Sequence, residues 1–271
     1  MKSPATLNPR DAAVLRPGAL EGRSGFVTGA GTGIGQAIAL RLIELGMAVF
    51  GTGRRSEKLE ETAHLAAGRA GSFAFQPCNV RDAEAIVALI RKVGEERGID
   101  LLVNNAGGQF FAPATAISRK GWDAVIDLNL NAVFTITQTA YPYLKARRGS
   151  VVNLSLSGVE RGSMGFAHSI AARAGVLGLT RTLALEWAKD GIRLNCIGPG
   201  TVVTEGLAGE AARPMLERLI AATPMGVATS VEEVAELVAF LATPAARLMT
   251  GQLIQIDGAA HLGPGLHLVP E

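Results

Sequence analysis

A glycine-rich segment near the amino terminus constrains the fold of this 271-residue chain more than any other feature. The stretch Gly29-Ala30-Gly31-Thr32-Gly33-Ile34-Gly35 follows a short apolar run, Gly25–Thr28, and leads into an amphipathic pattern over Gly33–Leu45. Glycines permit a tight turn and the close approach of a pyrophosphate, whose charge is attracted by the free N–H groups at the start of a helix. Because strand, turn and helix occur in the required order, this stretch predicts a dinucleotide site of the Rossmann type.

Strand and helix patterns alternate along the rest of the chain. Six further apolar runs have the length of strands: Ala48–Gly51, Ser72–Gln76, Leu101–Asn104, Ser150–Leu154, Arg193–Ile197 and Gln252–Ile256. Helical patterns lie between them, over Glu57–Ala67, Ala83–Glu96, Trp122–Arg147, Phe166–Lys189 and Val231–Leu241. This alternation predicts an α/β fold, a single Rossmann-type three-layer αβα domain with a seven-stranded parallel sheet that binds its ligand at the carboxyl ends of the strands.

We expect one folded domain with a short extension at each end. Residues 1–22 are rich in proline, glycine and alanine without a clear period and are interpreted as a surface extension. The Rossmann domain spans residues 23–260, and residues 261–271 form a tail. Within the domain, the long connection over residues 201–225 contains a short helical pattern, Glu210–Ala222. We interpret this connection as a lid over the substrate, with a plain surface helix as the alternative.

Composition and charge favour a small-molecule substrate. The chain is 48% hydrophobic, and its net charge of +2 comes from scattered lysines and arginines, so no surface for nucleic acid or an anionic membrane is predicted. No apolar run reaches the ~20 residues of a membrane span, and the first residues lack a signal-peptide pattern, so we expect a cytoplasmic protein. The two cysteines, Cys78 and Cys196, are interpreted as buried free thiols, and no residue pattern supports a metal site.

The end of the second strand indicates which dinucleotide is bound. A site that prefers NAD(H) normally places a carboxylate there for the ribose 2′-hydroxyl, but none occurs before Glu57. Arg54 and Arg55 occupy this stretch instead and offer bidentate donors for a 2′-phosphate. NADP(H) is therefore the preferred cofactor and NAD(H) the alternative, which applies if Arg54 is an ordinary solvated charge.

From about Leu20 to Gly258 the chain carries a set of motifs in a characteristic order. The glycine stretch matches a T-G-x-x-x-G-x-G pattern, and it is followed by Cys78-Asn79-Val80, Asn104-Asn105-Ala106-Gly107, Asn129 and Pro199-Gly200 with Thr204. In this order and spacing the chain resembles the short-chain dehydrogenase/reductase family.

The resemblance implies roles for these residues. Asn79 and Val80 would flank the adenine of the cofactor, and Asn129 would brace a proton-relay water. The loop beneath the adenosine ribose would consist of Asn105, Ala106 and Gly107 with Asn104. The nicotinamide carboxamide would be held by Pro199, Gly200, Val202 and Thr204.

The chain departs from the family at the catalytic residues. The family carries a serine after the fifth strand, then a tyrosine and a lysine four residues apart on the following helix. Aligned on Ala174-Gly175-Val176, these positions are Leu156, Ser169 and Arg173. Arg173 keeps a positive charge that can bind the nicotinamide ribose. A serine hydroxyl is a far weaker acid than a tyrosine with a pKa near ~10, so ordinary ketone reduction is not expected.

Five further stretches narrow the resemblance: Asn105-Ala106-Gly107-Gly108-Gln109-Phe110, Lys120-Gly121-Trp122, His168-Ser169, Ala171–Val176 and Ala184–Ala188. They are similar to the peroxisomal trans-2-enoyl-CoA reductase branch of the family, which also lacks the tyrosine and lysine. This resemblance implies hydride transfer from NADPH to the β-carbon of an α,β-unsaturated thioester such as an acyl-CoA. The resulting enolate needs hydrogen-bond donors more than a strong acid. As in most relatives, a homotetramer is expected.

Several side chains could supply the missing donors. His168 is a candidate general acid, because imidazole is the commonest one near neutral pH. Ser155 or Ser157 could donate to an oxyanion, with simple turn chemistry as the alternative, and Gln109 could donate to a thioester oxygen. The predicted catalytic set is completed by Asn129, Ser169 and Arg173.

Three functions are consistent with the sequence. The leading hypothesis is an NADPH-dependent oxidoreductase that reduces the C=C bond of an enoyl-CoA-type thioester. The missing acid motivates a second, a catalytically weak or silent NADP(H)-binding protein with a regulatory or assembly role. The third is an alcohol or ketone oxidoreductase in which His168 replaces the acid.

Overall fold

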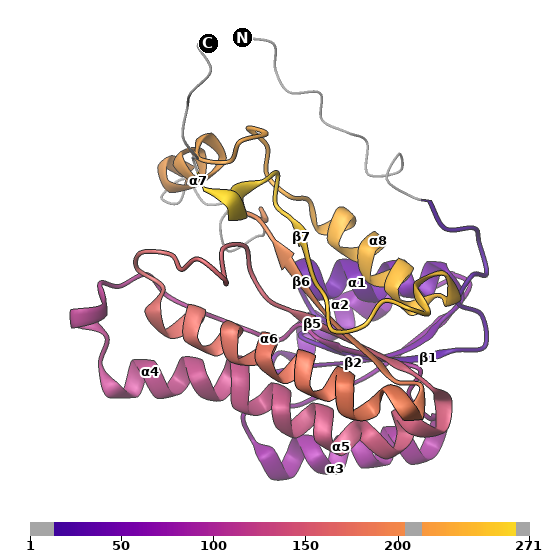
Figure 1. Ribbon diagram of the computed structural model, residues 1–271. Coiled ribbons are helices and arrows are strands. Elements are labelled where there is room, and N and C mark those ends of the chain that lie inside the picture. Colours follow the sequence, from indigo (N-terminus) through magenta and orange to yellow (C-terminus); the bar gives the residue numbers. More distant parts are fainter. Residues whose placement is uncertain (1–13, 204–212, 264–271) are drawn as a thin grey trace.

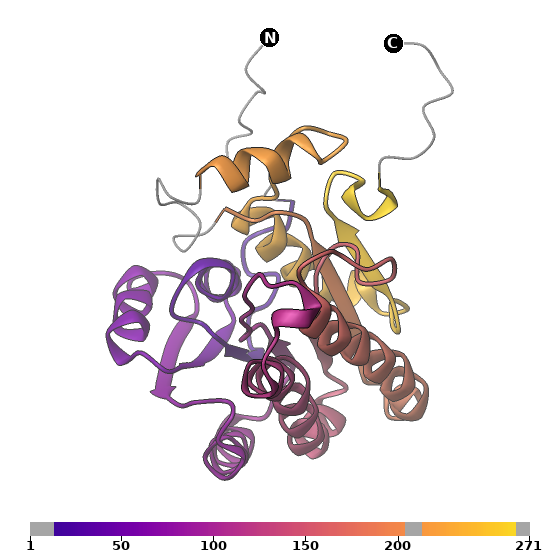
Figure 2. The same ribbon diagram turned by 90° about the vertical axis from the view of Figure 1, so that its left-hand side faces the viewer.

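The computed structural model describes residues 14–203 and 213–263. At its centre is one sheet of seven parallel strands in the order β3-β2-β1-β4-β5-β6-β7, with helices on both faces (Figures 1 and 2). The strands are β1 Ser24–Thr28, β2 Ala48–Gly53, β3 Ser72–Pro77, β4 Leu101–Asn104, β5 Ser150–Leu154, β6 Arg193–Pro199 and β7 Leu253–Ile256. This confirms the predicted fold class. The strand order reverses at β1, which lies between β2 and β4, and ligands of such sheets bind at this switch point.

Two groups of helices cover the sheet (Figure 1). One face carries α1 (Gly33–Glu44), α2 (Ser56–Ala66) and α8 (Val231–Ala242). The other carries α3 (Ala83–Arg97), α5 (Ala132–Arg147) and α6 (Ala167–Trp187), with α4 (Arg119–Ile126) leading into α5. Shorter elements in the connections are η2 (Ala114–Ala116), η4 (Ala188–Asp190), α7 (Arg213–Ala221), η7 (Pro244–Ala246) and η8 (Ala260–Leu262). Within the described ranges, no helix has the length and apolar character needed to cross a bilayer.

Side chains of the central strands alternate between two apolar layers, as the two-residue period of a strand requires. Val27 of β1 packs in the layer that contains α1 and α8, whereas its neighbour Phe26 packs in the layer that contains α3 and α5. Val103 and Leu102 of β4 divide in the same way. Burying each such side chain contributes about 1.5–3 kcal/mol, so the sheet is stabilised from both faces.

The long helix predicted over Trp122–Arg147 differs from the prediction in two ways. It begins earlier, at Arg119, because the Ser118 hydroxyl accepts a hydrogen bond of 3.1 Å from the Gly121 N–H and caps the first turn. It also contains a π-helical turn, η3 (Asp127–Asn131), between α4 and α5. Such turns occur frequently at functional sites, and this one contains the fully buried Asn129.

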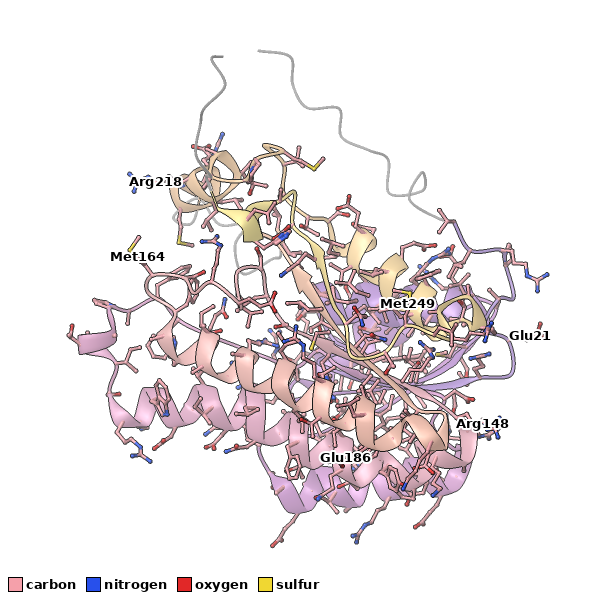
Figure 3. The ribbon with its side chains drawn as sticks, viewed as in Figure 1. Glu21, Arg148, Met164, Glu186, Arg218 and Met249 are labelled. Atoms are coloured by element: carbon pink, nitrogen blue, oxygen red, sulfur yellow. The ribbon has the colours of Figure 1, made fainter. Side chains whose placement is uncertain are left out.

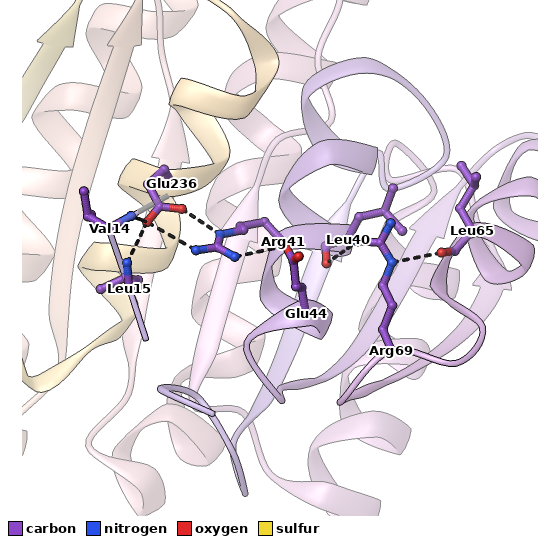
Figure 4. Close-up of polar contacts among 8 residues, drawn as sticks. All are labelled: Val14, Leu15, Leu40, Arg41, Glu44, Leu65, Arg69 and Glu236. Carbon is purple, nitrogen blue, oxygen red and sulfur yellow. Dashed lines mark hydrogen bonds and ion pairs between the residues drawn. The ribbon is translucent and has the colours of Figure 1, made fainter. Parts of the chain in front are cut away.

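The segment before β1 is bound to the domain through α1 and α8. The Glu236 carboxylate on α8 accepts hydrogen bonds from the N–H groups of Val14 and Leu15, at 2.9 and 3.2 Å, and from Arg41 Nε at 2.6 Å (Figure 4). Leu20 is fully buried in the apolar layer that contains α1 and α8. Burial alone would raise the pKa of Glu236, but the hydrogen bonds from Arg41 and the two N–H groups outweigh it and lower the pKa.

We expect Glu236→Gln to lower the free energy of unfolding near neutral pH by about 1–2 kcal/mol, because the amide leaves the Arg41 guanidinium without its buried anion. A group whose folded pKa is lowered contributes stability above its unfolded pKa and loses it as pH falls through the folded value. The difference from wild type should therefore shrink below about pH 4. Urea unfolding of wild type and variant, from neutral pH to below about pH 4, measures this difference in the free energy of unfolding. Glu44→Gln removes the exposed partner of Arg41 and should change stability little, so equal losses in both variants would contradict the prediction.

Candidate active site

The turn between β1 and α1 requires glycine at several positions. Gly29 and Gly33 have φ angles of +69° and +54°, in the left-handed region that other residues avoid. A Cβ on Gly35 would lie 2.1 Å from the Gly29 carbonyl oxygen and 2.3 Å from Asn105 Nδ2. The N-cap residue Thr32 makes no side-chain hydrogen bond to the first turn of α1. The helix start therefore lies at the carboxyl end of β1 without a side-chain cap, as an anion site requires.

Hydrogen bonds connect this turn to the segment that follows β4. Thr28 Oγ1 accepts from the N–H groups of Asn105 and Ala106 at 3.0 and 2.9 Å, and Asn105 Nδ2 donates to the Thr28 carbonyl oxygen at 2.9 Å. Because β1 and β4 are neighbours in the sheet, these bonds fix the two loops relative to each other.

A cavity of about 660 Å³ opens between these loops and the end of β2, a volume within the range of natural ligand sites. Most of the residues predicted to bind the dinucleotide line it: Gly29, Gly31, Thr32, Gly33, Ile34, Gly35, Arg54, Arg55, Asn79, Val80, Asn105, Ala106 and Gly107. They follow β1, β2, β3 and β4, so the structure brings them together at the switch point of the sheet.

Other residues of this lining were not predicted. Lys58 of α2, Arg81 after β3 and Leu128 of η3 also face the cavity. Lys58 lies in the first turn of α2, four residues after Arg54, so the sequence already placed a third cation close to the two predicted arginines. The expectation of a buried Cys78 is wrong, because β3 ends at Pro77 and leaves Cys78 half-buried in the cavity wall. Cys196 is buried, as expected.

The lining fits a phosphorylated dinucleotide. It contains four cationic side chains, Arg54, Arg55, Lys58 and Arg81, and none of its described residues is acidic. Arg54 and Arg55 are exposed and can form bidentate hydrogen bonds to a phosphate. The lining also lacks, among its described residues, the carboxylate that a ribose 2′-hydroxyl would require.

Asn129 of η3 holds the loop after β4 through both backbone groups of one residue. Its Nδ2 donates to the Gly108 carbonyl oxygen at 2.8 Å, and its Oδ1 accepts from the Gly108 N–H at 3.1 Å. Oδ1 also accepts from Arg173 Nη2 at 3.4 Å. Asn129 therefore positions the loop between the cavity and α6, while the water-bracing role stays a prediction.

Arg173 occupies the lysine position of the family and is buried beside the same loop. Its Nη1 donates to the Leu154 carbonyl oxygen at the end of β5, and a Cβ on Gly107 would lie 2.4 Å from Nη2. Burial lowers the pKa of Arg173 to about 10, so the guanidinium keeps its charge near neutral pH. Its Nε is buried and has no hydrogen-bond partner within the described part of the chain.

The two serines that flank Leu156 differ in their partners. Ser157 Oγ donates to the Asp257 carboxylate at 2.5 Å, and Asp257 also accepts from the His261 N–H at 2.7 Å. His261 thus belongs to a Ser157–Asp257–His261 cluster in which its Nδ1 lies 2.9 Å from the carboxylate. Ser155 Oγ is buried without a partner among the described residues. Of the two candidate oxyanion donors, Ser157 is already bound to a carboxylate.

The start of α6 contains the remaining candidates. His168 is fully buried, its Nδ1 accepts from the Ser169 N–H at 2.9 Å, and its ring meets Phe110 edge-on with centroids 4.2 Å apart. Ser169 is also fully buried, and its Oγ donates to Gln109 Oε1 at 2.6 Å. Ser169 therefore reaches the loop after β4, whereas Phe110 covers His168.

The residues predicted at the nicotinamide carboxamide begin with Pro199, the last residue of β6, and none of those that the structure describes lines the cavity. The Pro199 carbonyl oxygen accepts from the Ser157 N–H at 2.9 Å, and a Cβ on Gly200 would lie 2.9 Å from Asp257 Cα. Val202 is buried and forms a bridge with Thr229. Pro199 and Gly200 thus lie near the Ser157 cluster. Thr204 lies outside the described residues.

Apolar side chains are exposed around the end of β6 and the loop between β5 and α6. α7, part of the connection predicted to be a lid, lies beyond the sheet on the same side as η8 (Figure 2). Met164, 99% exposed, projects outward from the loop between β5 and α6 (Figure 3). Other exposed apolar residues on the surrounding segments are Phe110, Phe111, Val203, Met225 and Leu262. The role of residues 201–225 as a lid stays a prediction.

Comparison with known proteins gives the class of this chain. The family model described as "Enoyl-(Acyl carrier protein) reductase" matches residues 29–261. A "Probable 2,4-dienoyl-CoA reductase" from Bacillus subtilis is 36% identical over 90% of this chain and 99% of its own. The "3-oxoacyl-(acyl-carrier-protein) reductase FabG" from Thermotoga maritima is 38% identical over 88% of this chain and 98% of its own.

Solved structures show the same fold. A "putative NAD(P) dependent gluconate 5-dehydrogenase" from Beutenbergia cavernae, with bound NADP at low occupancy, superposes with a TM-score of 0.86 at 32% identity over 92% of this chain and 100% of that one. The chain belongs to the short-chain dehydrogenase/reductase family and is an oxidoreductase. Its relatives include proteins named as a "Probable 2,4-dienoyl-CoA reductase" and as a 3-oxoacyl reductase, so family membership alone does not choose between a C=C and a C=O bond.

Proposed function

We propose that this chain is an NADP(H)-dependent reductase of the C=C bond of an enoyl thioester such as an enoyl-CoA. The observation that carries the proposal is the pair at the tyrosine and lysine positions, a buried Ser169 bonded to Gln109 and a buried Arg173. Ser169 is a far weaker acid than the tyrosine of the family, and Arg173 contributes a positive charge to the site. A conjugated alkene requires donors to the carbonyl oxygen rather than a proton on it. The dienoyl-CoA reductase from Bacillus subtilis, 36% identical, supports the same choice.

The proposed cofactor site extends from the cavity to the residues at the end of β6. When bound, NADPH supplies the hydride that reduces the alkene. The glycine turn over residues 29–35 holds the pyrophosphate, and Arg54 with Arg55 holds the 2′-phosphate. Asn79 and Val80 flank the adenine, while Asn105, Ala106 and Gly107 lie beneath the adenosine ribose. Arg173 binds the nicotinamide ribose, and the carboxamide site consists of Pro199, Gly200, Val202 and Thr204.

The chain's own residues have two further tasks in this proposal. The buried charge of Arg173 makes the local potential positive and so favours the negative charge that develops on the substrate oxygen. Asn129 keeps the loop after β4 in place through Gly108, so that substrate and cofactor meet in one orientation.

We also propose a homotetramer in the cytoplasm. The exposed apolar residues Phe134 on α5 and Leu185 on α6 support this assembly, which light scattering would test.

Purified protein with NADPH and a series of trans-2-enoyl-CoA thioesters tests the function. We expect oxidation of NADPH, a product two hydrogens heavier by mass spectrometry, and a kcat/KM at least ~100-fold above that for the matching 3-oxoacyl-CoA, since the ketone lacks its general acid. Faster reduction of the 3-oxoacyl thioester would instead support the ketone alternative. Tight NADPH binding without turnover of either series would support the silent binding protein.

A further inference from the structure

Gln109 is fixed at two points beside the site. Its chain neighbour Gly108 is bound by Asn129 through both backbone groups, and its own Oε1 accepts the Ser169 hydroxyl at 2.6 Å. Ser169 is fully buried, so this hydroxyl has no access to water. Gln109 is otherwise exposed, and its Nε2 makes no hydrogen bond to any residue that the structure describes.

In this contact the Gln109 amide turns its oxygen toward Ser169. An amide nitrogen only donates, so with Oε1 accepting from the Ser169 hydroxyl the two Nε2 hydrogens remain for another partner. Ser169 lies where the family places its tyrosine, but a serine side chain is too short to extend as far as a tyrosine hydroxyl. Gln109, bonded to Ser169, brings an amide donor to this part of the loop after β4, and an amide does not release its proton near neutral pH.

The other candidate donors near the site are less suited to this task. The Ser157 hydroxyl is bound to Asp257, and Arg173 Nη1 is bound to the Leu154 carbonyl oxygen. Phe110 packs against the buried His168, and the Ser155 hydroxyl is buried as well. Among these described candidates, Gln109 is the one that is both exposed and left with unpaired donors.

We propose that Gln109 is a catalytic residue whose Nε2 donates to the carbonyl oxygen of the substrate thioester, and that Ser169 is the positioning residue that orients it. The inference rests on the proposed function. In the reaction the β-carbon gains a hydride from the reduced nicotinamide dinucleotide, and the dinucleotide is thereby oxidised. The electron pair of the C=C bond moves onto the thioester as an enolate, and the α-carbon then takes a proton from water. Because the amide stabilises the enolate oxygen without protonating it, the site selects alkenes conjugated to a carbonyl over ketones.

Gln109→Glu gives the sharpest test because the two side chains have the same shape. A protonated glutamic acid can still accept from Ser169 and donate to the substrate, whereas the carboxylate has no donor. On an enoyl-CoA substrate, kcat should therefore fall by about 10²-fold as pH rises through the carboxyl pKa, while wild type shows no such step and the Kd of NADPH changes less than about twofold. Gln252→Glu makes the same change at an exposed glutamine of the same chain and should leave the pH profile as in wild type.

Ser169 is tested by a double-variant cycle. Gln109→Ala should lower kcat by about 10²-fold, and Ser169→Ala by about tenfold, with recovery in Ser169→Thr, which keeps the hydroxyl. In the Gln109→Ala background, Ser169→Ala should cause no further loss, because a positioning residue acts only through the group that it orients.

The outcomes separate this inference from the proposed function. A Gln109→Ala enzyme that keeps kcat within about threefold of wild type overturns the inference and leaves enoyl reduction in place. Losses that multiply in the double variant overturn the positioning role of Ser169. A wild-type enzyme that reduces no enoyl thioester, or prefers the 3-oxoacyl thioester, overturns the proposed function and this inference with it.

Discussion

Gly35→Ala is expected to raise the Kd of NADPH by at least about 100-fold, because the added methyl group would displace the turn that binds the pyrophosphate. Its Cβ would lie 2.1 Å from the Gly29 carbonyl oxygen and 2.3 Å from Asn105 Nδ2, so both the Gly29 backbone and the Asn105 side chain have to move. The same movement separates the loops that Thr28 and Asn105 join, and with them two walls of the cavity. Titration of NADPH by calorimetry measures the loss, and circular dichroism shows whether the variant is folded.

Gly178→Ala is the matched control for this variant. Gly178 lies on α6 with nothing within 4 Å of an added Cβ, so the same substitution there meets open space. It should bind NADPH as wild type does, because the added methyl group lies on the outside of α6 and away from the cavity. A folded Gly35→Ala protein with wild-type affinity would show that the dinucleotide does not bind at this turn.

Most of the fold was predictable because its signals are local. The central strands β1, β4, β5 and β6 are buried on both faces and are therefore mainly apolar runs, and the glycine turn follows the first run directly. Strand ends were less predictable. β2 continues to Gly53 because Thr52 and Gly53 pair with Gln76 and Pro77 of β3, and such pairing has no counterpart in the hydrophobicity of either segment.

The site was predictable only where its residues adjoin these strand ends. Arg54 and Arg55 follow β2 and were identified, whereas Lys58 faces the cavity through the rotation of α2. The bond between Ser169 and Gln109 joins residues 60 positions apart, and that between Ser157 and Asp257 joins residues 100 apart. Which polar groups meet over such separations depends on how α6 and the loops pack on the sheet, so the sequence showed the candidates without their partners.

Replacing both Arg54 and Arg55 with alanine is expected to raise the Kd of NADPH by about 10²-fold or more and that of NADH by less than about threefold. The two cofactors differ only in the 2′-phosphate, and each charge-assisted hydrogen bond to it contributes about 1.5–3 kcal/mol. Both arginines are exposed, so their removal should not unfold the protein. Because exposed charges are screened by salt, the wild-type preference for NADPH should also weaken as ionic strength rises.

Two further variants show whether position or charge alone sets this preference. Arg91→Ala removes the same charge from an exposed residue of α3 that does not line the cavity, and both Kd values should stay as in wild type. Arg54→Asp places a carboxylate where an NAD site binds the ribose 2′-hydroxyl, and it should reverse the preference toward NADH. If the double alanine variant loses both cofactors equally, Arg54 and Arg55 bind a part that the cofactors share. If it keeps its NADPH affinity, the 2′-phosphate is bound by the other cations of the lining, Lys58 and Arg81.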